Sequence, residues 1–176
     1  MMVACLTYFF SLEIGACPER LRNNFFAGLF HDLPEAVTRD IISPVKGAVP
    51  ELSKVISVIE RELVEKEIYP LIEDSWIQDF KYFTEGEFDS KIVEEGKPRK
   101  VTTDEIIQHF NDDRYLPIDG ELIKVADHLA AFVESFKASQ TGIQTPQLKE
   151  GEHNLRAQYA GKTIGGVNVG AIYADF

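Results

Sequence analysis

The sequence predicts an all-α helical bundle with a small surface hairpin or loop insertion. Apolar residues recur at helical spacing in most long segments, and proline or glycine separates these segments. Short extended pieces flanking a turn are confined to residues 88–101. The 176 residues, 44% of them hydrophobic, suffice for a sizeable core. We therefore expect one domain over residues 1–176.

The first elements are two helices joined at residues 13–17. Residues 1–12 are apolar almost all round and begin without a capping residue. The second helix opens at Pro18 with an acid in its first turn. Its predicted buried stripe consists of Leu21, Phe25, Phe26, Leu29 and Phe30. Because proline disfavours helical geometry in the preceding residue, Leu33 and Pro34 should end this helix and start a short new one.

The middle of the chain should hold a loop over residues 41–50 and a long amphipathic helix over residues 51–72. Pro70 should bend or close that helix. Its predicted inward residues are Leu52, Val55, Ile56, Ile59, Leu63 and Val64. A further short helix is expected over residues 76–83, where aromatic residues have helical spacing.

The C-terminal part should contain three more helices. They are expected over residues 103–110, 121–139 and 147–159, the second being the strongest helical pattern in the chain. Residues 163–176 are rich in glycine and small apolar residues, and we assign no structure to this tail.

Charge and composition exclude several classes of partner. The formal charge is −11, from 29 acidic and 18 basic residues, which disfavours polymeric nucleic acid and anionic membrane surfaces. No apolar run reaches the roughly 18 residues of a membrane span, and the first ten residues lack the basic start of a signal peptide. We expect a cytoplasmic protein, in which Cys5 and Cys17 are reduced structural thiols.

A carboxylate, Asp127, interrupts the strongest helix at a position that should lie largely inside the protein. Ile123, Ala130 and Ala131 surround it at helical spacing, and an unpaired anion there would be costly. One solution is an intrahelical ion pair with Lys124. The other is a metal ion shared with a second cluster of donors.

That second cluster is His31-Asp32, at the end of the apolar run that begins with Leu29. An imidazole and two carboxylates suit Mg, Mn, Co, Ni, Fe or Zn, and such an ion lowers the pKa of a bound water. A lone His-Asp dipeptide is weak evidence, since a core histidine bonded to a backbone carbonyl is commoner. The wider pattern is more specific.

HDLPEAVTRDIISPVK at residues 31–46 and KVADHLAA at residues 124–131 together resemble the HD-domain superfamily of metal-dependent phosphohydrolases, and within it the bacterial 5′-deoxynucleotidase group. The resemblance implies the following roles: His31, Asp32 and Asp127 bind the metal, Glu35 orients or deprotonates the attacking water, Asp40 lies near the sugar, and Lys46 contacts phosphate. Other interpretations stay open, with Glu35 a favoured first-turn acid and Asp40 and Lys46 solvated loop residues. His128 points about 100° away from Asp127 on a helix, which favours a boundary histidine over a ligand.

The chain departs from the family pattern in one respect. Family members carry a further histidine ligand upstream of the His-Asp pair, whereas no histidine precedes His31. We therefore expect a chain truncated at its N-terminus, with weakened metal affinity if it is natively this short.

The resemblance implies hydrolysis of a nucleoside monophosphate, a small-molecule substrate. The alternatives are a noncatalytic HD-fold module that binds a nucleotide or a partner protein, hydrolysis of an alarmone or cyclic dinucleotide, and a purely structural bundle. An unfilled apolar face on the first helix would also favour a homodimer.

Overall fold

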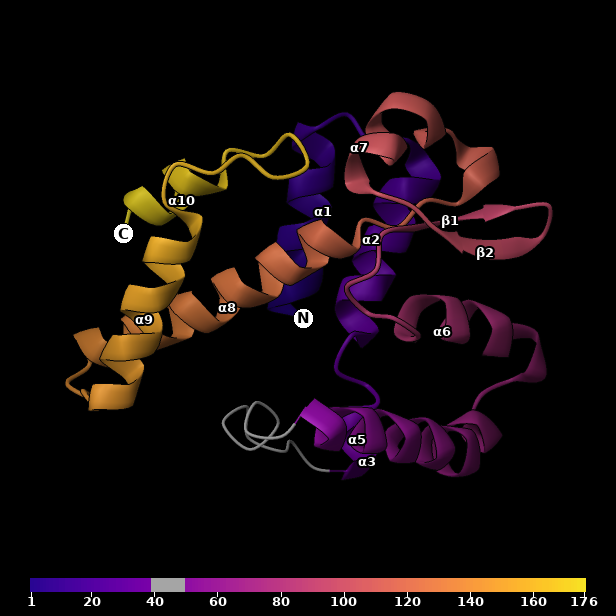
Figure 1. Ribbon diagram of the computed structural model, residues 1–176, viewed down its shortest axis with the longest axis horizontal. Coiled ribbons are helices and arrows are strands. Elements are labelled where there is room, and N and C mark those ends of the chain that lie inside the picture. The colour runs from indigo at the N-terminus through magenta and orange to yellow at the C-terminus, as the bar shows by residue number, and fades with distance from the viewer. Residues whose placement is uncertain (39–49) are drawn as a thin grey trace. The chain divides into compact units, whose positions relative to one another are not determined.

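The protein is described by a computed structural model that covers residues 1–38 and 50–176. The described residues form two compact units, one made of residues 1–29 and 86–176 and the other of residues 30–85. Helices dominate both units and a single hairpin supplies the strands, so the predicted all-α class is confirmed (Figure 1). Each unit is described by itself below.

The larger unit contains most of the helices and the hairpin. Its elements are α1 (Met2–Glu13), α2 (Pro18–Phe30), β1 (Lys91–Glu94), β2 (Lys97–Lys100), α7 (Thr103–Glu105), a π-helical turn (Ile106–Phe110), a 3₁₀ turn (Asp113–Tyr115), α8 (Gly120–Gln140), α9 (Pro146–Tyr159) and α10 (Val169–Ala174). The last residue of α2, Phe30, is counted with the smaller unit. These bounds agree with the predicted helices to within a few residues, apart from α10, which lies in the tail left unassigned.

Helix α8 forms the centre of this unit. Helices α1 and α9 both pack on α8, and α10 packs on α9. Apolar residues on the packed sides of α8 are buried: Leu122, Ile123, Val125, Ala126, Leu129, Ala130 and Phe132. The tail joins the same core through Val167, Val169 and Tyr173. At Gly170 an added Cβ would lie 2.5 Å from the backbone nitrogen of Gly161, so this close approach requires glycine.

The hairpin confirms the turn predicted within residues 88–101. The strands are antiparallel, with Lys91 opposite Lys100 and Glu94 opposite Lys97. Glu95 and Gly96 between them have φ values of 51° and 74°, as a tight two-residue turn of the right twist requires. Ile92 is fully buried, so the hairpin is anchored at its β1 end.

The smaller unit contains α3 (Glu35–Thr38), α5 (Pro50–Leu63), a π-helical turn (Val64–Ile68), two 3₁₀ turns (Tyr69–Leu71 and Asp74–Trp76) and α6 (Ile77–Thr84). Pro70 lies in the first 3₁₀ turn, where the long helix closes as predicted. Ile56 and Val64 are buried, whereas Val55 and Ile59 are 53% and 45% exposed, so their predicted inward orientation is wrong. The reason is that Val55 and Ile59 lie about 100° and 60° around the helix from Ile56, on the same side of it.

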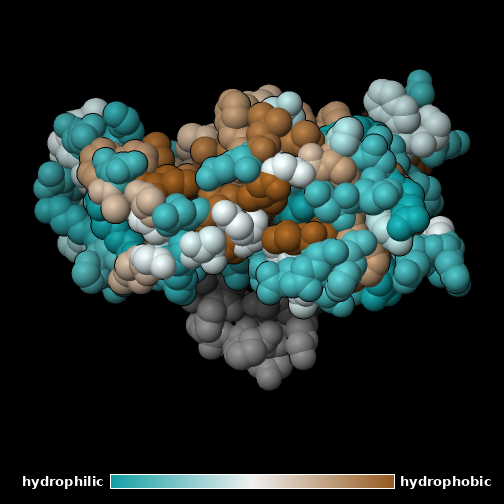
Figure 2. All heavy atoms as spheres, turned by 90° about the horizontal axis from the view of Figure 1, so that it is seen from above, coloured by the Kyte–Doolittle hydropathy of each residue, from teal (hydrophilic) through white to brown (hydrophobic). Residues whose placement is uncertain are grey.

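Hydrophobic side chains also occur on the surface. Figure 2 shows hydrophobic residues among hydrophilic ones on one face of the molecule. Helix α1 is apolar on its outer side as well as its inner side, as predicted, and Phe9 and Leu12 are 62% and 47% exposed. Among the described helices, none combines the length and apolarity needed to cross a bilayer.

Candidate metal centre

The His31-Asp32 pair lies in a tight turn between two helices of the sequence. The amide of Leu33 donates to the carbonyl of Phe30, the last residue of α2, at 2.9 Å. The amide of Glu35 then donates to the carbonyl of Asp32 at 3.0 Å, where α3 begins. The predicted change of helix at Leu33 and Pro34 is therefore confirmed.

The two side chains of the pair place a nitrogen and an oxygen donor next to each other. The Nε2 atom of His31 lies 3.1 Å from Oδ2 of Asp32. Two ligands at right angles around an ion with ligand distances of about 2.1 Å lie about 3.0 Å apart. His31 is buried, whereas the Asp32 side chain is 68% exposed. The separation is that of two neighbouring ligands of a divalent ion and also that of an ion pair between the two side chains.

Glu35 occupies the first turn of α3, and its backbone bond to Asp32 keeps it one turn away from the pair. Its side chain is half-buried. Both predicted interpretations, a catalytic carboxylate and a favoured first-turn acid, are compatible with this position. Asp40 and Lys46 lie outside the described residues, and their assigned roles stay predictions.

Asp127 lies in the middle of α8, in the larger unit. It is half-buried, which agrees with the predicted position largely inside the protein. Helices α1 and α9 pack on α8, and one stripe of α8 residues remains exposed. Exposed residues of this stripe are Glu121, Lys124, Ala131 and Glu134. Asp127 lies within that stripe and is less exposed than these neighbours.

Lys124, the alternative partner for Asp127, contacts an aromatic ring. Its ammonium nitrogen lies 5.9 Å from the centroid of the Phe88 ring, within range of a cation–π interaction.

His128 contacts α9, as expected for a boundary histidine. Its Nδ1 atom forms a 2.7 Å hydrogen bond with the hydroxyl of Tyr159. Burial lowers the pKa of His128, while the charge of Asp127 acts in the opposite direction. Burial is also the main cause that raises the pKa of Tyr159 and Tyr173, and the negative charge of Asp127 raises both further. Both phenols are therefore neutral at physiological pH.

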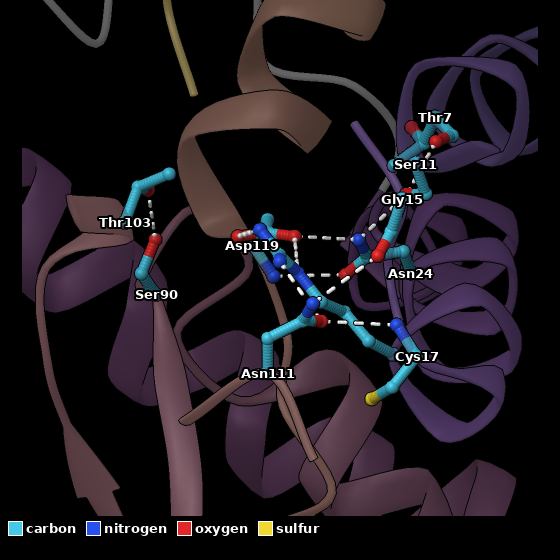
Figure 3. A network of polar contacts seen from close by, with 10 residues as sticks. Thr7, Ser11, Gly15, Cys17, Asn24, Ser90, Thr103, Asn111 and Asp119 are labelled. Carbon is cyan, nitrogen blue, oxygen red and sulfur yellow. Dashed lines mark hydrogen bonds and ion pairs between the residues drawn. The ribbon is translucent and has the colours of Figure 1, made fainter. Parts of the chain in front are cut away.

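Another charged residue of this helix region was not singled out from the sequence. Asp119, at the start of α8, is fully buried and lies beside Asn24 and Asn111 (Figure 3). It pairs with the buried guanidinium of Arg20 in α2. Nε and Nη2 of Arg20 donate to the two carboxylate oxygens at 2.7 and 2.9 Å. Asn24 donates to Asp119 at 2.8 Å and accepts from its backbone amide at 2.8 Å. The sequence pattern that could have indicated this network is the i, i+4 spacing of Arg20 and Asn24, which puts both side chains on one side of α2.

This buried network extends into α1 and into the segment before α8. Asn24 also donates to the hydroxyl of Ser11, and Arg20 donates to the side-chain oxygen of Asn111. Asn111 in turn accepts from the amide of Cys17. The network has no exposed carboxylate, so it joins helices and offers no ligand to solvent.

The predicted metal ligands belong to both units, His31 and Asp32 to the smaller and Asp127 to the larger. Within either unit, the described His, Cys, Asp and Glu side chains form no group of three or more suited to hold an ion by themselves. The chemistry of the donors fits a divalent ion, since an imidazole and carboxylates are its usual ligands.

Comparison with known proteins gives one match. A family model described as HD domain matches residues 1–156. No curated protein and no solved structure matches the chain. Proteins with HD domains are generally metal-dependent hydrolases and usually bind divalent metals.

Proposed function

This chain belongs to the HD domain family, and we propose that it is a metal-dependent phosphohydrolase acting on the phosphomonoester of a nucleoside monophosphate. The observation that carries the proposal is the donor pair of His31 and Asp32, 3.1 Å apart in the turn after α2. The finer assignment, to the 5′-deoxynucleotidase group, is supported by the sequence pattern of residues 31–46 and 124–131.

In this proposal His31, Asp32 and Asp127 hold one divalent ion, of Mn, Co, Mg, Ni, Fe or Zn. When bound, such an ion favours deprotonation of water at neutral pH and draws electron density from phosphorus. The partial exposure of Asp127 supports its part in the proposal, because an enclosed carboxylate would not be accessible.

Glu35 accepts a proton from the attacking water in the proposed reaction. Water oxygen bonds to phosphorus, the bond from phosphorus to the 5′ oxygen breaks, and Glu35 returns the proton to the leaving oxygen. The products are a nucleoside and inorganic phosphate. Asp40 is proposed to contact the sugar, and Lys46 the phosphate.

The test measures Mn²⁺ binding by calorimetry on chelator-treated protein and phosphate release from a panel of nucleoside monophosphates. We expect Asp127→Asn to weaken Mn²⁺ binding by at least about 100-fold, since a ligand matters more than the groups that orient it. Phosphate release should fall to background in the same variant. Glu121→Gln removes an exposed carboxylate of the same helix and serves as the matched control, with both properties unchanged.

Glu35→Gln separates catalysis from metal binding. It should keep Mn²⁺ affinity and reduce turnover by about 10²- to 10⁴-fold, the usual contribution of a general base. Unchanged phosphate release by Asp127→Asn would reject the metal-centre assignment. Nucleotide binding without metal-dependent turnover would support the noncatalytic module instead, and turnover only of an added alarmone or cyclic dinucleotide would correct the substrate class.

A further inference from the structure

Four aromatic side chains gather on the side of α8 that faces the C-terminal helices. We call His128, Phe132, Tyr159 and Tyr173 the C-terminal aromatic cluster. The rings of Tyr159 and Tyr173 are stacked, with centroids 5.1 Å apart and planes inclined by 16°. The Phe132 and Tyr173 centroids are 4.8 Å apart, and those of His128 and Tyr159 are 5.8 Å apart. The cluster therefore connects α8, α9 and α10.

Arg156 fixes the same three helices from α9. One guanidinium nitrogen donates to the backbone carbonyl of Tyr173 at 3.1 Å. The guanidinium carbon lies 5.0 Å from the centroid of Phe132. Residues 157–176 lie beyond the part of the chain that the HD domain model matches, and they supply both tyrosines. The packing of the tail therefore lies outside the matched region.

The two tyrosines differ in what their hydroxyl groups contact. Both side chains are buried, 3% exposed for Tyr159 and 2% for Tyr173. The hydroxyl of Tyr159 bonds to His128 at 2.7 Å, with the side-chain amide of Gln158 3.5 Å from the same His128 nitrogen. The hydroxyl of Tyr173 has no hydrogen-bond partner among the described residues. One hydroxyl thus connects two helices, while the other adds only its ring to the packing.

We propose that Tyr159 is a positioning residue for Asp127, acting through its hydrogen bond to His128, an inference that rests on the proposed metal-dependent function. His128 follows Asp127 directly, so a bond that fixes its side chain against α9 also fixes the rotation of this turn of α8. Asp127 then keeps its direction on the open stripe. Ligand groups must be held to within about 0.5 Å for productive geometry, and supporting hydrogen bonds provide that precision.

The electrostatics agree with this arrangement. The charge of Asp127 raises the pKa of Tyr159, after the larger effect of burial. A phenol that stays protonated retains its hydroxyl hydrogen for the bond with His128. The charge of Asp127 thus favours the protonated form of Tyr159, whose hydrogen bond supports the turn of α8 that carries Asp127.

The two tyrosines provide a matched pair of variants in the complete chain. Tyr159→Phe deletes the bonded hydroxyl and keeps the stacked ring, whereas Tyr173→Phe deletes the unpartnered hydroxyl of the neighbouring ring. We expect Tyr159→Phe to weaken Mn²⁺ binding by about 10-fold in calorimetry, the lower end for groups that orient a ligand. Tyr173→Phe should stay within about twofold, because removal of a buried unpartnered hydroxyl breaks no bond.

Turnover at saturating Mn²⁺ distinguishes a positioning role from a purely structural one. At saturating Mn²⁺, Tyr159→Phe should recover most of its kcat for phosphate release, since the lost property is metal affinity. His128→Gln should keep Mn²⁺ affinity within about threefold, because an amide can also bond to the hydroxyl. In a His128→Leu background, Tyr159→Phe should weaken binding no further, as expected when two residues act through one bond.

The proposal is overturned if Tyr159→Phe binds Mn²⁺ like the unaltered chain, or if both phenylalanine variants lose affinity equally. Equal losses would assign the effect to packing of the rings. Thermal unfolding of the metal-free proteins shows whether each variant folds, and if Tyr159→Phe does not, His128→Gln and His128→Leu decide by the same measurement. Unchanged binding by Asp127→Asn would reject the metal-centre assignment itself, whereas loss there with unchanged Tyr159→Phe would reject only the positioning role.

Discussion

Asp119 and Asp127 lie on the same helix region, eight residues apart in sequence, and the structure uses them in opposite ways. Asp119 is fully buried, and Arg20 and Asn24 bond to its carboxylate oxygens. Asp127 is half-buried on the open stripe of α8. The carboxylate of Asp119 joins helices through a guanidinium and an amide, whereas Asp127 is the one that the HD motif pattern assigns to a metal.

Burial and pairing, more than residue type, therefore distinguish a structural acidic residue from a candidate functional one. A buried charge is tolerated only when it is paired and hydrogen-bonded, and Arg20 with Asn24 meets that condition for Asp119. Such a fully paired group has no capacity left for a metal.

The largest effect is expected at the enclosed carboxylate. Arg20→Met keeps much of the side-chain volume but leaves the Asp119 carboxylate buried without its cation. We expect a loss of about 3–5 kcal/mol in the free energy of unfolding, as when one partner of a buried ion pair is removed. Urea denaturation of the metal-free chain measures it.

The control for this loss is the double variant Arg20→Met with Asp119→Asn. An amide at position 119 carries no charge and can still bond to Asn24, so the double variant should recover part of the lost stability. A loss below about 1 kcal/mol in Arg20→Met would show that the pair is less enclosed than the distances indicate.

A smaller effect is expected at a carboxylate that is structural but solvated. Glu105 completes a capping box with Thr102, and the backbone hydrogen bond from Thr102 is the main cause that lowers the pKa of Glu105. Its folded pKa lies below the unfolded value of 4.5, so its contribution is present above about pH 4.5. It is lost as the pH falls through the lower folded value. Glu105→Gln should therefore flatten this part of the pH profile of stability, and an unchanged profile would contradict the capping role.

The smallest effect on stability is expected at the open carboxylate. Asp127→Asn in the metal-free chain should change the free energy of unfolding by no more than about 1 kcal/mol, because the amide keeps the shape of a half-buried side chain and opens no cavity. Added Mn²⁺ should then stabilise the unaltered chain and not the variant, because a ligand that binds only the folded state raises its stability. A large loss without metal would place Asp127 with Asp119 among the structural acids.

Much of the fold could be predicted because the signals are local. Proline at position 18 starts α2, Leu33 and Pro34 end its run, and the Glu-Gly turn forms the hairpin. The tail was missed because α10 is six residues long and depends on packing against α9, which no short pattern encodes. The inward side of α5 was misassigned at Val55 and Ile59, since an apolar stripe does not tell which of its edges meets a neighbour.

The sequence by itself determined the helices, the turn that holds His31 and Asp32, and the HD motif pattern, because spacing along one chain decides each of them. Only the tertiary structure decided that Asp119 pairs with Arg20, 99 residues away, and that Asp127 stays partly open. It also decided that Tyr159 reaches His128. Burial and long-range hydrogen bonds depend on which surfaces pack together. The local sequence therefore does not distinguish a paired carboxylate in a helix from an unenclosed one, because the difference depends on neighbours that are distant in sequence.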